Sequence, residues 1–338
     1  MEKRKNIIIA LVVAATFIVF YSYIVLLPAG DIPEDGDASI IIHKGESLTS
    51  AATKIESKGI IGSKTLLIRL ISLIGSAERV KAGKYDFKAN RSYLAIAKLL
   101  LTGSNSPIKV TFPEGLTYRK MARIVQEELA VDSLEFIRTC ENRTILDAFK
   151  IKADNLEGYL FPDTYHFYYS AEAPTIVRSM VERFFSVFDD SLRGQAKKLG
   201  FDTHKAITMA SLIEKETGRV DERRIISAVF HNRLKLGMRL QCDPTVLYAL
   251  PDLDRSLRYK DLEITSPYNT YRYYGLPPGP IANPGKKSLQ AAVNPVDVSY
   301  LYFVANGEGG HLFASTNRQH NNNRIKIKRL QRSKNNSG

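Results

Sequence analysis

The sequence predicts an α+β protein that is preceded by a single N-terminal transmembrane helix. Three observations support this fold class. An uncharged apolar run covers residues 7–27, strand-like runs followed by glycine turns and helices occur twice between residues 41 and 125, and helical periodicity dominates residues 175–234. The strands and helices do not alternate regularly, so a βαβ series with a parallel sheet is not expected.

The N-terminal run, IIIALVVAATFIVFYSYIVLL, covers the 21 residues from Ile7 to Leu27. A helix of this length spans ~31 Å, which is about the thickness of a bilayer core. The alternative is a cleaved signal peptide, but its apolar region has only about 7–15 residues and ends at a small-residue cleavage site. We therefore expect an uncleaved membrane anchor.

Charged residues on the two sides of this run predict its orientation. Lys3, Arg4 and Lys5 precede it. Four acidic residues follow it, at Asp31, Glu34, Asp35 and Asp37. The positive-inside rule then places residues 1–6 in the cytoplasm as a short tail. In a bacterial cell, the rest of the chain would lie in the periplasm or extracytoplasmic space, anchored in the cytoplasmic (inner) membrane. Residues 28–38, rich in Gly, Pro and Asp, predict a linker.

Two segments share the order of strand, glycine turn, Ser or Thr N-cap, and helix. Residues 41–47 lead into a helix over 48–55, and residues 110–117 lead into a helix over 118–125. The match predicts an internal repeat, although strand–turn–helix units are common. Further elements are expected from periodicity and residue type: helices over 63–74, 92–101, 175–188, 203–217 and 222–234, and strands over 84–87 and 300–305.

Composition excludes several classes of protein. The chain has 338 residues, 44% hydrophobic and 25% charged, which suits a folded protein and not a disordered or collagen-like one. Two cysteines, Cys140 and Cys242, are too few for a disulfide framework, although one Cys140–Cys242 disulfide stays open. The formal net charge is +13, but residues 1–5 and 324–338 carry eight of these charges, so no nucleic-acid partner is predicted.

Phosphate-loop, nucleophile-elbow and HExxH motifs are absent and the six His are scattered, so we expect no metal and no cofactor.

The predicted helix over 203–217 carries the most informative pattern. Its apolar residues form one wide arc, and the opposite face carries Thr208, Ser211 and Lys215. The two flanks of the arc carry Glu214 and Glu216, which lie about 200° apart around the helix. A carboxyl group among apolar neighbours loses hydration, which favours the acid form that a general acid needs. The pattern makes Glu214 a better candidate than Glu216 for this role but does not settle the choice between them. The alternative is a boundary glutamate that pairs with Arg219, Arg223 or Arg224.

Loops at 239–245, 266–271 and 275–280 are dense in amide, hydroxyl and flat aromatic side chains, and residues 157–165 have a similar texture. Sugars are bound by such groups, because their hydroxyls take hydrogen bonds and their rings rest on aromatic faces. The alternative is a rigid Pro-rich loop with structural Asn and Tyr residues.

Four stretches resemble the YceG-like (MltG) family of endolytic murein transglycosylases. They are EGYLFPDTY at 157–165, ASLIEKET at 210–217 with NRLKLGMRLQCDPTV at 232–246, SPYNTYRYYGLPPGPIANPG at 266–285, and YLYFVANGEGGHLFASTNRQHN at 300–321. The resemblance extends over nearly the whole chain. It implies a LysM-like strand–helix module over 39–107, a mixed α/β catalytic region of lytic transglycosylase type over 108–323, and a basic C-terminal tail over 324–338.

The resemblance also implies an activity. It is that of a lytic transglycosylase, a lyase that cleaves the β-1,4 bond between N-acetylmuramic acid and N-acetylglucosamine in nascent peptidoglycan glycan strands. The product is a 1,6-anhydro-N-acetylmuramic acid end, and the cut would terminate glycan elongation near the peptidoglycan synthases. The alternative is a non-catalytic, membrane-anchored, peptidoglycan-binding scaffold protein.

The resemblance assigns the catalytic role to Glu214, the first glutamate of ASLIEKET. Cys242 is a departure, since a small hydroxyl residue such as Thr is expected there. The residues that we expect to bind substrate are Gln241, Asp243, Tyr268, Asn269, Tyr271 and Glu157.

Overall fold

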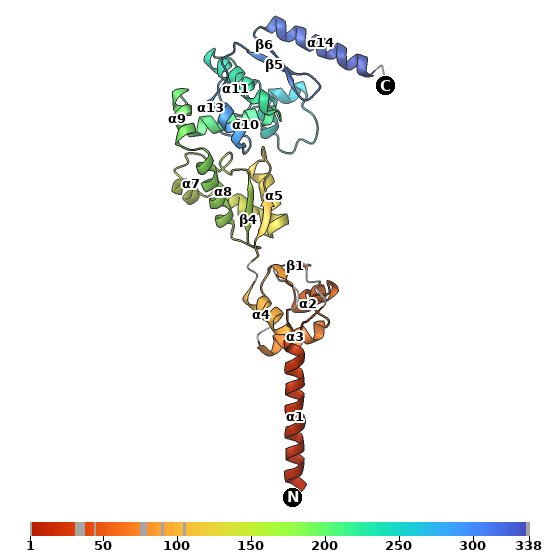
Figure 1. Cartoon of the computed structure of the whole chain (residues 1–338). Coiled ribbons are helices and arrows are strands. Elements are labelled where there is room, and N and C mark those ends of the chain that lie inside the picture. Colours follow the sequence, from red (N-terminus) through yellow and green to blue (C-terminus); the bar gives the residue numbers. More distant parts are fainter. Residues whose placement is uncertain are drawn as a thin grey trace. The chain divides into compact units, whose positions relative to one another are not determined.

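The computed structural model describes residues 2–30, 38–43, 45–74, 80–88, 91–103 and 106–335. The chain divides into two compact units (Figure 1). The first contains residues 1–110, 127–130 and 166–171, and the second contains residues 111–126, 131–165 and 172–338. Most of the predicted linker, residues 31–37, lies outside the described residues.

Helix α1 (Glu2–Leu26) contains the predicted apolar run. Its stretch Arg4–Tyr23 is long and apolar enough to cross a membrane, and none of this stretch is buried inside the protein. The prediction of a single N-terminal apolar helix is therefore confirmed. By length and composition alone, such a helix suits both a membrane anchor and a signal sequence.

The first unit has its own hydrophobic core between strands and helices. Strand β1 (Ala38–Ile42) pairs antiparallel with β2 (Gly83–Phe87), so that Ile40 faces Tyr85 in the register. Helices α2 (Leu48–Ser57) and α3 (Lys64–Ile74) lie between these strands in the sequence, and α4 (Tyr93–Thr102) follows them. The core is built from fully buried apolar side chains of all these elements, among them Ile42, Ile55, Leu67, Phe87 and Leu100. Burial of this many apolar groups accounts for a compact unit.

Both predicted strand–turn–helix segments are confirmed. Strand β3 (Ile108–Thr111), which pairs with β4 (Thr164–Phe167), precedes α5 (Tyr118–Leu129) as β1 precedes α2. Gly45 and Gly115 have φ angles of 81° and 77°, which only glycine adopts without steric cost. The Ser47 hydroxyl accepts a hydrogen bond from Ser50 N (3.2 Å), and the Thr117 hydroxyl accepts one from Lys120 N (3.3 Å). The two N-caps are therefore equivalent.

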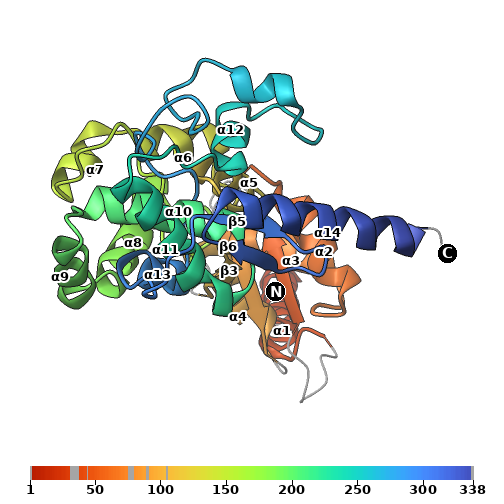
Figure 2. The same ribbon diagram turned by 90° about the horizontal axis from the view of Figure 1, so that it is seen from above.

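The second unit is mainly helical, and α10 (Thr203–Glu216) lies at its centre (Figure 2). Around α10 pack α9 (Asp190–Lys198), α11 (Val220–Lys235), α12 (Asp243–Ala249) and α13 (Lys286–Val293). Helices α6 (Ser133–Cys140), α7 (Arg143–Ala148) and α8 (Ala173–Val187) and a 3₁₀ helix (Tyr259–Glu263) complete this part. The predicted helices over 175–188, 203–217 and 222–234 are confirmed, whereas α6, α7, α9, α12 and α13 were not predicted.

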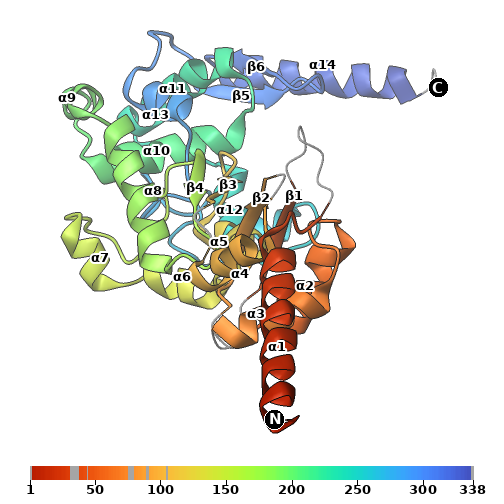
Figure 3. The ribbon, with the colours of Figure 1, turned by 60° about the horizontal axis from the view of Figure 1, so that its bottom comes forward.

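A hairpin and a long helix end the chain. Strands β5 (Tyr302–Ala305) and β6 (His311–Ala314) pair antiparallel, and α14 (Asn317–Asn335) packs on them. The far part of α14 extends away from this hairpin (Figures 2 and 3). The start of the predicted basic tail, residue 324, falls inside α14, where Ile327 is buried. Together the two units confirm the predicted mixture of α and β structure.

Candidate active site

Helix α10 is buried on all sides from Ala206 to Ile213. The predicted polar face of this helix is wrong, because Thr208 and Ser211 are buried with the apolar residues. Their hydroxyls are satisfied locally: Thr208 donates to His204 O (2.8 Å) and Ser211 donates to Thr208 O (2.7 Å). Ser211 also accepts a hydrogen bond from Ile281 N (3.0 Å), which fixes the Pro-rich loop against the helix. Charged side chains near the surface occur at the two ends of α10, with Lys205 in the first turn and Glu214, Lys215 and Glu216 in the last.

Glu214 is held in a buried ion pair. Arg223 Nη2 donates to Glu214 Oε1 (3.0 Å), Gly285 N donates to Glu214 Oε2 (3.0 Å), and the side chains of Glu214 and Arg223 are each 6% exposed. These hydrogen bonds to both carboxyl oxygens fix the position of the Glu214 side chain between α10 and α11. This arrangement is the alternative that the sequence left open, in which Glu214 pairs with a nearby arginine.

Glu114 joins this ion pair and was missed by the sequence analysis. Its carboxylate lies 3.6 Å from Arg223 Nη2. A Cβ atom at Gly285 would lie only 1.7 Å from Glu114 Oε1, so glycine is required where this backbone passes. Burial and the neighbouring charge of Glu214 raise the pKa of Glu114. No pattern in the sequence indicated Glu114, because it follows a strand far from α10 in the chain.

Glu216 has different surroundings, as the predicted 200° separation requires. It is partly buried, and burial raises its pKa to about 7, while a hydrogen bond from the Cys242 thiol opposes this rise. The charge of Asp243 raises the pKa further, and His311 and Arg233 lower it. A carboxyl group with a pKa near 7 is present in both its acid and its base form at neutral pH, as acid–base catalysis requires.

Three of the predicted substrate-binding residues gather near Glu216. The Tyr271 hydroxyl donates a hydrogen bond to Asp243 Oδ1, and the Cys242–Asp243 segment begins α12. Gln241 is exposed and has a φ of +49°, an uncommon value for a residue with a side chain. Its backbone N–H donates to Thr270 O (3.1 Å). Strained backbone is often found at binding and catalytic sites, because the surrounding structure must maintain it.

Asn269 lies apart from this group, inside the fold. It is fully buried, its amide donates to Leu262 O and Ile264 O (2.9 Å each), and its Oδ1 accepts from Tyr271 N (3.0 Å). All of these bonds organise the loop itself. The alternative of a rigid loop with a structural Asn therefore describes Asn269 better than substrate binding does.

Glu157 also lies inside the fold, at 2% exposure. Its Oε1 accepts from Tyr118 N (3.1 Å), at the start of α5, and from Asn283 Nδ2 (2.8 Å). Burial raises its pKa to about 8. Tyr248 donates to Glu157 Oε2 (3.4 Å), and the Tyr248 ring packs on Tyr268 with centroids 4.9 Å apart. Tyr268 thus belongs with the Glu157 group, and Glu157 itself joins three segments of the unit.

A histidine–glutamate pair beside Glu216 was also missed. His311 donates from its backbone to Glu222 Oε1 (2.9 Å), and its Nδ1 lies 2.7 Å from Glu222 Oε2. A Cβ at Gly310 would lie 2.6 Å from Glu222 Oε1, so the glycine before His311 permits this approach. The only signal in the sequence was the position of His311 in the fourth family-like stretch. Arg233 completes this side of the site and donates to Leu301 O and Leu240 O (2.7 Å each).

Metal ligands do not gather in this site. Within the described ranges, no group of three or more His, Cys, Asp or Glu side chains is placed to hold a metal ion. Cys140 and Cys242 are both buried and free.

The fold and site define an α+β protein whose central helix ends in a partly buried carboxyl group beside exposed polar loops. The chain belongs to the YceG-like family, whose model matches residues 40–326.

Three related proteins agree with this assignment. An endolytic murein transglycosylase of Bacillus subtilis is 34% identical, and the match covers 84% of this chain and 82% of that protein. An endolytic murein transglycosylase of Streptococcus pneumoniae is 27% identical over 91% of this chain and 64% of that protein. The crystal structure of a yceG-like protein from Listeria monocytogenes is 33% identical, with a TM-score of 0.63 over 85% of this chain and 98% of that one.

Proposed function

We propose that this chain is an endolytic lytic transglycosylase. It cleaves the β-1,4 bond between N-acetylmuramic acid and N-acetylglucosamine in peptidoglycan strands and leaves a 1,6-anhydro end. Relatives from two bacteria are named endolytic murein transglycosylases. The observation that carries the proposal is the match to these relatives, since the Bacillus subtilis protein is 34% identical over 84% of this chain. The carboxyl group that the proposal uses is Glu216, which is partly buried beside Asp243 and Tyr271.

The proton donor in this proposal is Glu216, whereas the family resemblance assigned the role to Glu214. The contacts support the change. Arg223 and Gly285 N bind both oxygens of Glu214, so these oxygens are engaged by the protein itself. Glu216 has no such pairing among its described contacts, and its acid form is already favoured by burial.

The mechanism needs one carboxyl group acting twice. Protonated Glu216 donates to the glycosidic oxygen as the bond to C1 of N-acetylmuramic acid breaks. The C6 hydroxyl of the same sugar then attacks C1, and ionised Glu216 accepts the hydroxyl proton, which restores its acid form. Because the nucleophile belongs to the substrate, its effective concentration is high without a nucleophile from the protein. A second carboxylate at the spacing of retaining or inverting hydrolases is not required.

In this proposal, Asp243 and Tyr271 assist the reaction. Asp243 is exposed at the first turn of α12, and its Oδ1 already accepts the Tyr271 hydroxyl. A carboxylate beside the reacting carbon would stabilise the positive charge that develops on the sugar ring. Gln241 has an exposed amide for the sugar hydroxyls.

The remaining parts of the proposal concern location. Helix α1 is proposed as an uncleaved anchor in the bacterial cytoplasmic membrane, with the units outside and near the peptidoglycan synthases. The strand–helix–helix–strand order of residues 38–87, with its own core, supports a LysM-like binding module there. The catalytic region is proposed over 108–323. A scaffold protein without catalysis is not favoured, because relatives from two bacteria are named endolytic murein transglycosylases.

The test compares two isosteric variants of the full chain in detergent. Glycan strands are incubated with the wild type, Glu216→Gln and Glu214→Gln, and the products are analysed by mass spectrometry. We expect internal fragments with 1,6-anhydro ends from the wild type, and about 10²–10⁴-fold less product from Glu216→Gln, since a general acid contributes a factor of this size.

Other outcomes would contradict parts of the proposal. If Glu216→Gln cleaves normally and a folded Glu214→Gln does not, the proton donor is Glu214. Reducing ends in place of anhydro ends would make the enzyme a hydrolase. Intact strands after incubation with folded wild type would support the scaffold alternative.

A further inference from the structure

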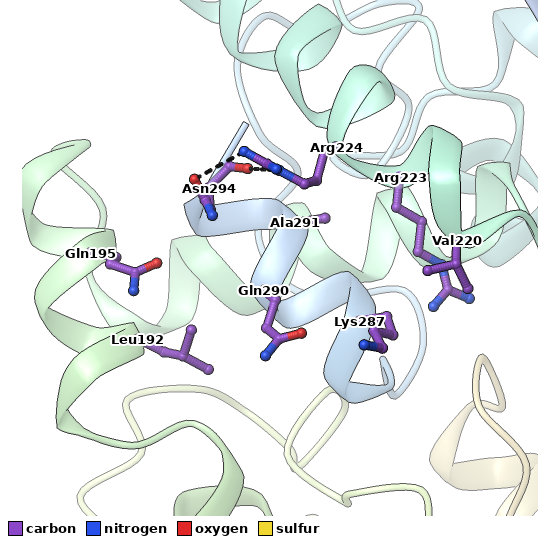
Figure 4. A pocket seen from close by; sticks show the side chains of 9 residues that line it. All are labelled: Leu192, Gln195, Val220, Arg223, Arg224, Lys287, Gln290, Ala291 and Asn294. Atoms are coloured by element: carbon purple, nitrogen blue, oxygen red, sulfur yellow. Dashed lines mark hydrogen bonds between the residues drawn. The ribbon is translucent and has the colours of Figure 1, made fainter. Parts of the chain in front are cut away.

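A cavity of about 380 Å³ lies between α9, α11 and α13 (Figure 4). Its nine lining residues come from these helices and their ends. Arg224 and Asn294 lie at the C-terminal end of α13, and Lys287 lies in its first turn. Gln195 on α9 and Gln290 on α13 lie between these ends. The volume lies in the range of small-ligand sites and is large for a single inorganic ion.

The lining combines positive charge with carboxamides. Six of the nine described lining residues are polar: Gln195, Arg223, Arg224, Lys287, Gln290 and Asn294. None of the nine carries a carboxylate. Arg223 is already paired with Glu214 and Glu114. Arg224 and Lys287 have no carboxylate partner among the described contacts, so their charges favour a negatively charged ligand. The carboxamides can both donate and accept hydrogen bonds, which matches the amide groups of a peptide.

The two arginines of the wall differ in how far their hydrogen-bonding groups are already used. Its side chain is 6% exposed, and its Nε is buried without a hydrogen-bond partner among the described residues. A buried, unpartnered N–H of a charged group is costly. Two of the five N–H groups of the Arg224 guanidinium donate to Asn294, one to its carbonyl O (2.8 Å) and one to its Oδ1 (3.3 Å). Arg224 can therefore donate to a further acceptor in the cavity, whereas Arg223 is held by Glu214 and Glu114.

We propose that this cavity binds the carboxylate-bearing stem peptide that N-acetylmuramic acid carries. This inference rests on the proposed function, since it names a second part of the same substrate. A peptide carboxylate pairs with Arg224 and Lys287, and the peptide amides pair with Gln195 and Gln290. Phosphate would leave the accepting groups of the carboxamides unused, so a peptide fits the wall better. Because Arg223 also holds Glu214, the occupied cavity is linked directly to α10.

The first test measures binding without cleavage. The full chain in detergent is titrated by calorimetry with a synthetic stem tetrapeptide and with the same peptide after amidation of its carboxylates. We expect the amidated peptide to bind the wild type about tenfold more weakly than the unmodified peptide does. We also expect the unmodified peptide to bind Lys287→Glu about tenfold more weakly than the wild type. In each case one charge-assisted hydrogen bond is lost. Lys205→Glu is the matched control: Lys205 is also an exposed first-turn lysine, on α10, and lines no part of the cavity. It should bind as the wild type does.

Several results would overturn the inference. They are equal binding of both peptides, no effect of Lys287→Glu, no binding at millimolar peptide, or displacement of the peptide by inorganic phosphate at equal concentration.

The second test separates this inference from the proposed function. Cleavage of peptide-bearing strands is compared with cleavage of strands from which an amidase has removed the peptides. We expect Lys287→Glu to raise KM about tenfold for peptide-bearing strands only, with kcat unchanged. If the wild type cleaves neither strand, the proposed function fails, while the calorimetry still decides whether the cavity binds the peptide. A KM that rises equally for both strands would contradict the cavity assignment.

Discussion

Glu214 and Glu216 lie two residues apart on α10, and their side chains meet different partners. Arg223 and Gly285 N bind the carboxylate of Glu214. Glu216 instead faces Cys242, and burial raises its pKa to about 7. Helical periodicity predicted that both would be flanked by apolar residues, which is correct. It could not identify their partners, because Gly285 is 71 residues away in the chain.

The composition of a loop did not show which of its polar residues could bind substrate. Asn269 and Glu157 were predicted from the amide and carboxylate content of their loops, yet both have their polar atoms bonded inside the protein. The same residue types serve sugar binding and loop construction, so the sequence could not separate the two uses. Gln241, Asp243 and Tyr271 were predicted from the same loops and do gather beside the candidate site.

The hydrogen bond from Cys242 to Glu216 predicts how the rate depends on pH. Since the acid form of Glu216 donates the proton, we expect kcat/KM to fall as pH rises through about 7. A hydroxyl is a stronger donor than a thiol, so Cys242→Ser should stabilise the ionised carboxylate and lower the pKa of Glu216. The alkaline fall in kcat/KM should then begin at lower pH.

Cys140→Ser is the matched control for this pH profile, since Cys140 is the other buried free cysteine and lies on α6. It should leave the profile in place. A profile that Cys242→Ser leaves unchanged would show that another group controls the alkaline limb.

Among the elements, long helices were predicted better than short ones. The helices over 175–188, 203–217 and 222–234 have enough turns to show periodicity, whereas α7, α12 and α13 have six to eight residues each. Fewer than about two turns cannot establish a period of 3.6 residues. The polar face predicted for α10 failed for another reason. Thr208 and Ser211 are buried because their hydroxyls bond to backbone carbonyls within the helix, which removes the cost of burying them.

The ion pair between α10 and α11 predicts a large effect on stability. Arg223→Met removes the cation and leaves the Glu214 carboxylate buried, with Gly285 N as its remaining described donor. Breaking a buried pair in this way costs about 3–5 kcal/mol in the free energy of unfolding. Urea unfolding of the full chain, followed by far-UV circular dichroism, measures this cost.

Adding Glu214→Gln to Arg223→Met should restore much of the lost stability, because the double variant buries no charge at Glu214. Additive losses from the two substitutions would contradict this account. The single variant Arg183→Met is a control for the surface, since Arg183 pairs with Asp163 at 2.8 Å but is 48% exposed. Its loss should stay within about 1 kcal/mol.

At the scale of the whole molecule, the predicted class of fold was correct. The α+β mixture and the apolar N-terminal helix follow from patterns that extend over many residues. The division into units was less accessible: residues 127–130 and 166–171 belong to the first unit although their neighbours in sequence belong to the second. Such a division depends on contacts between distant segments, and local periodicity carries no information about them.

The N-terminal helix predicts a location for the whole molecule. The stretch Arg4–Tyr23, with its basic residues at the N-terminal end, should remain in the membrane uncleaved, with the N-terminus in the cytoplasm. Protein purified from the membrane fraction should therefore retain the peptide that contains residues 1–27, as mass spectrometry can establish. Alkaline phosphatase fused after residue 338 should be active, since this enzyme folds only outside the cytoplasm. A mature chain that begins shortly after Leu27 would identify a signal peptide, and an inactive fusion on an intact chain would reverse the predicted orientation.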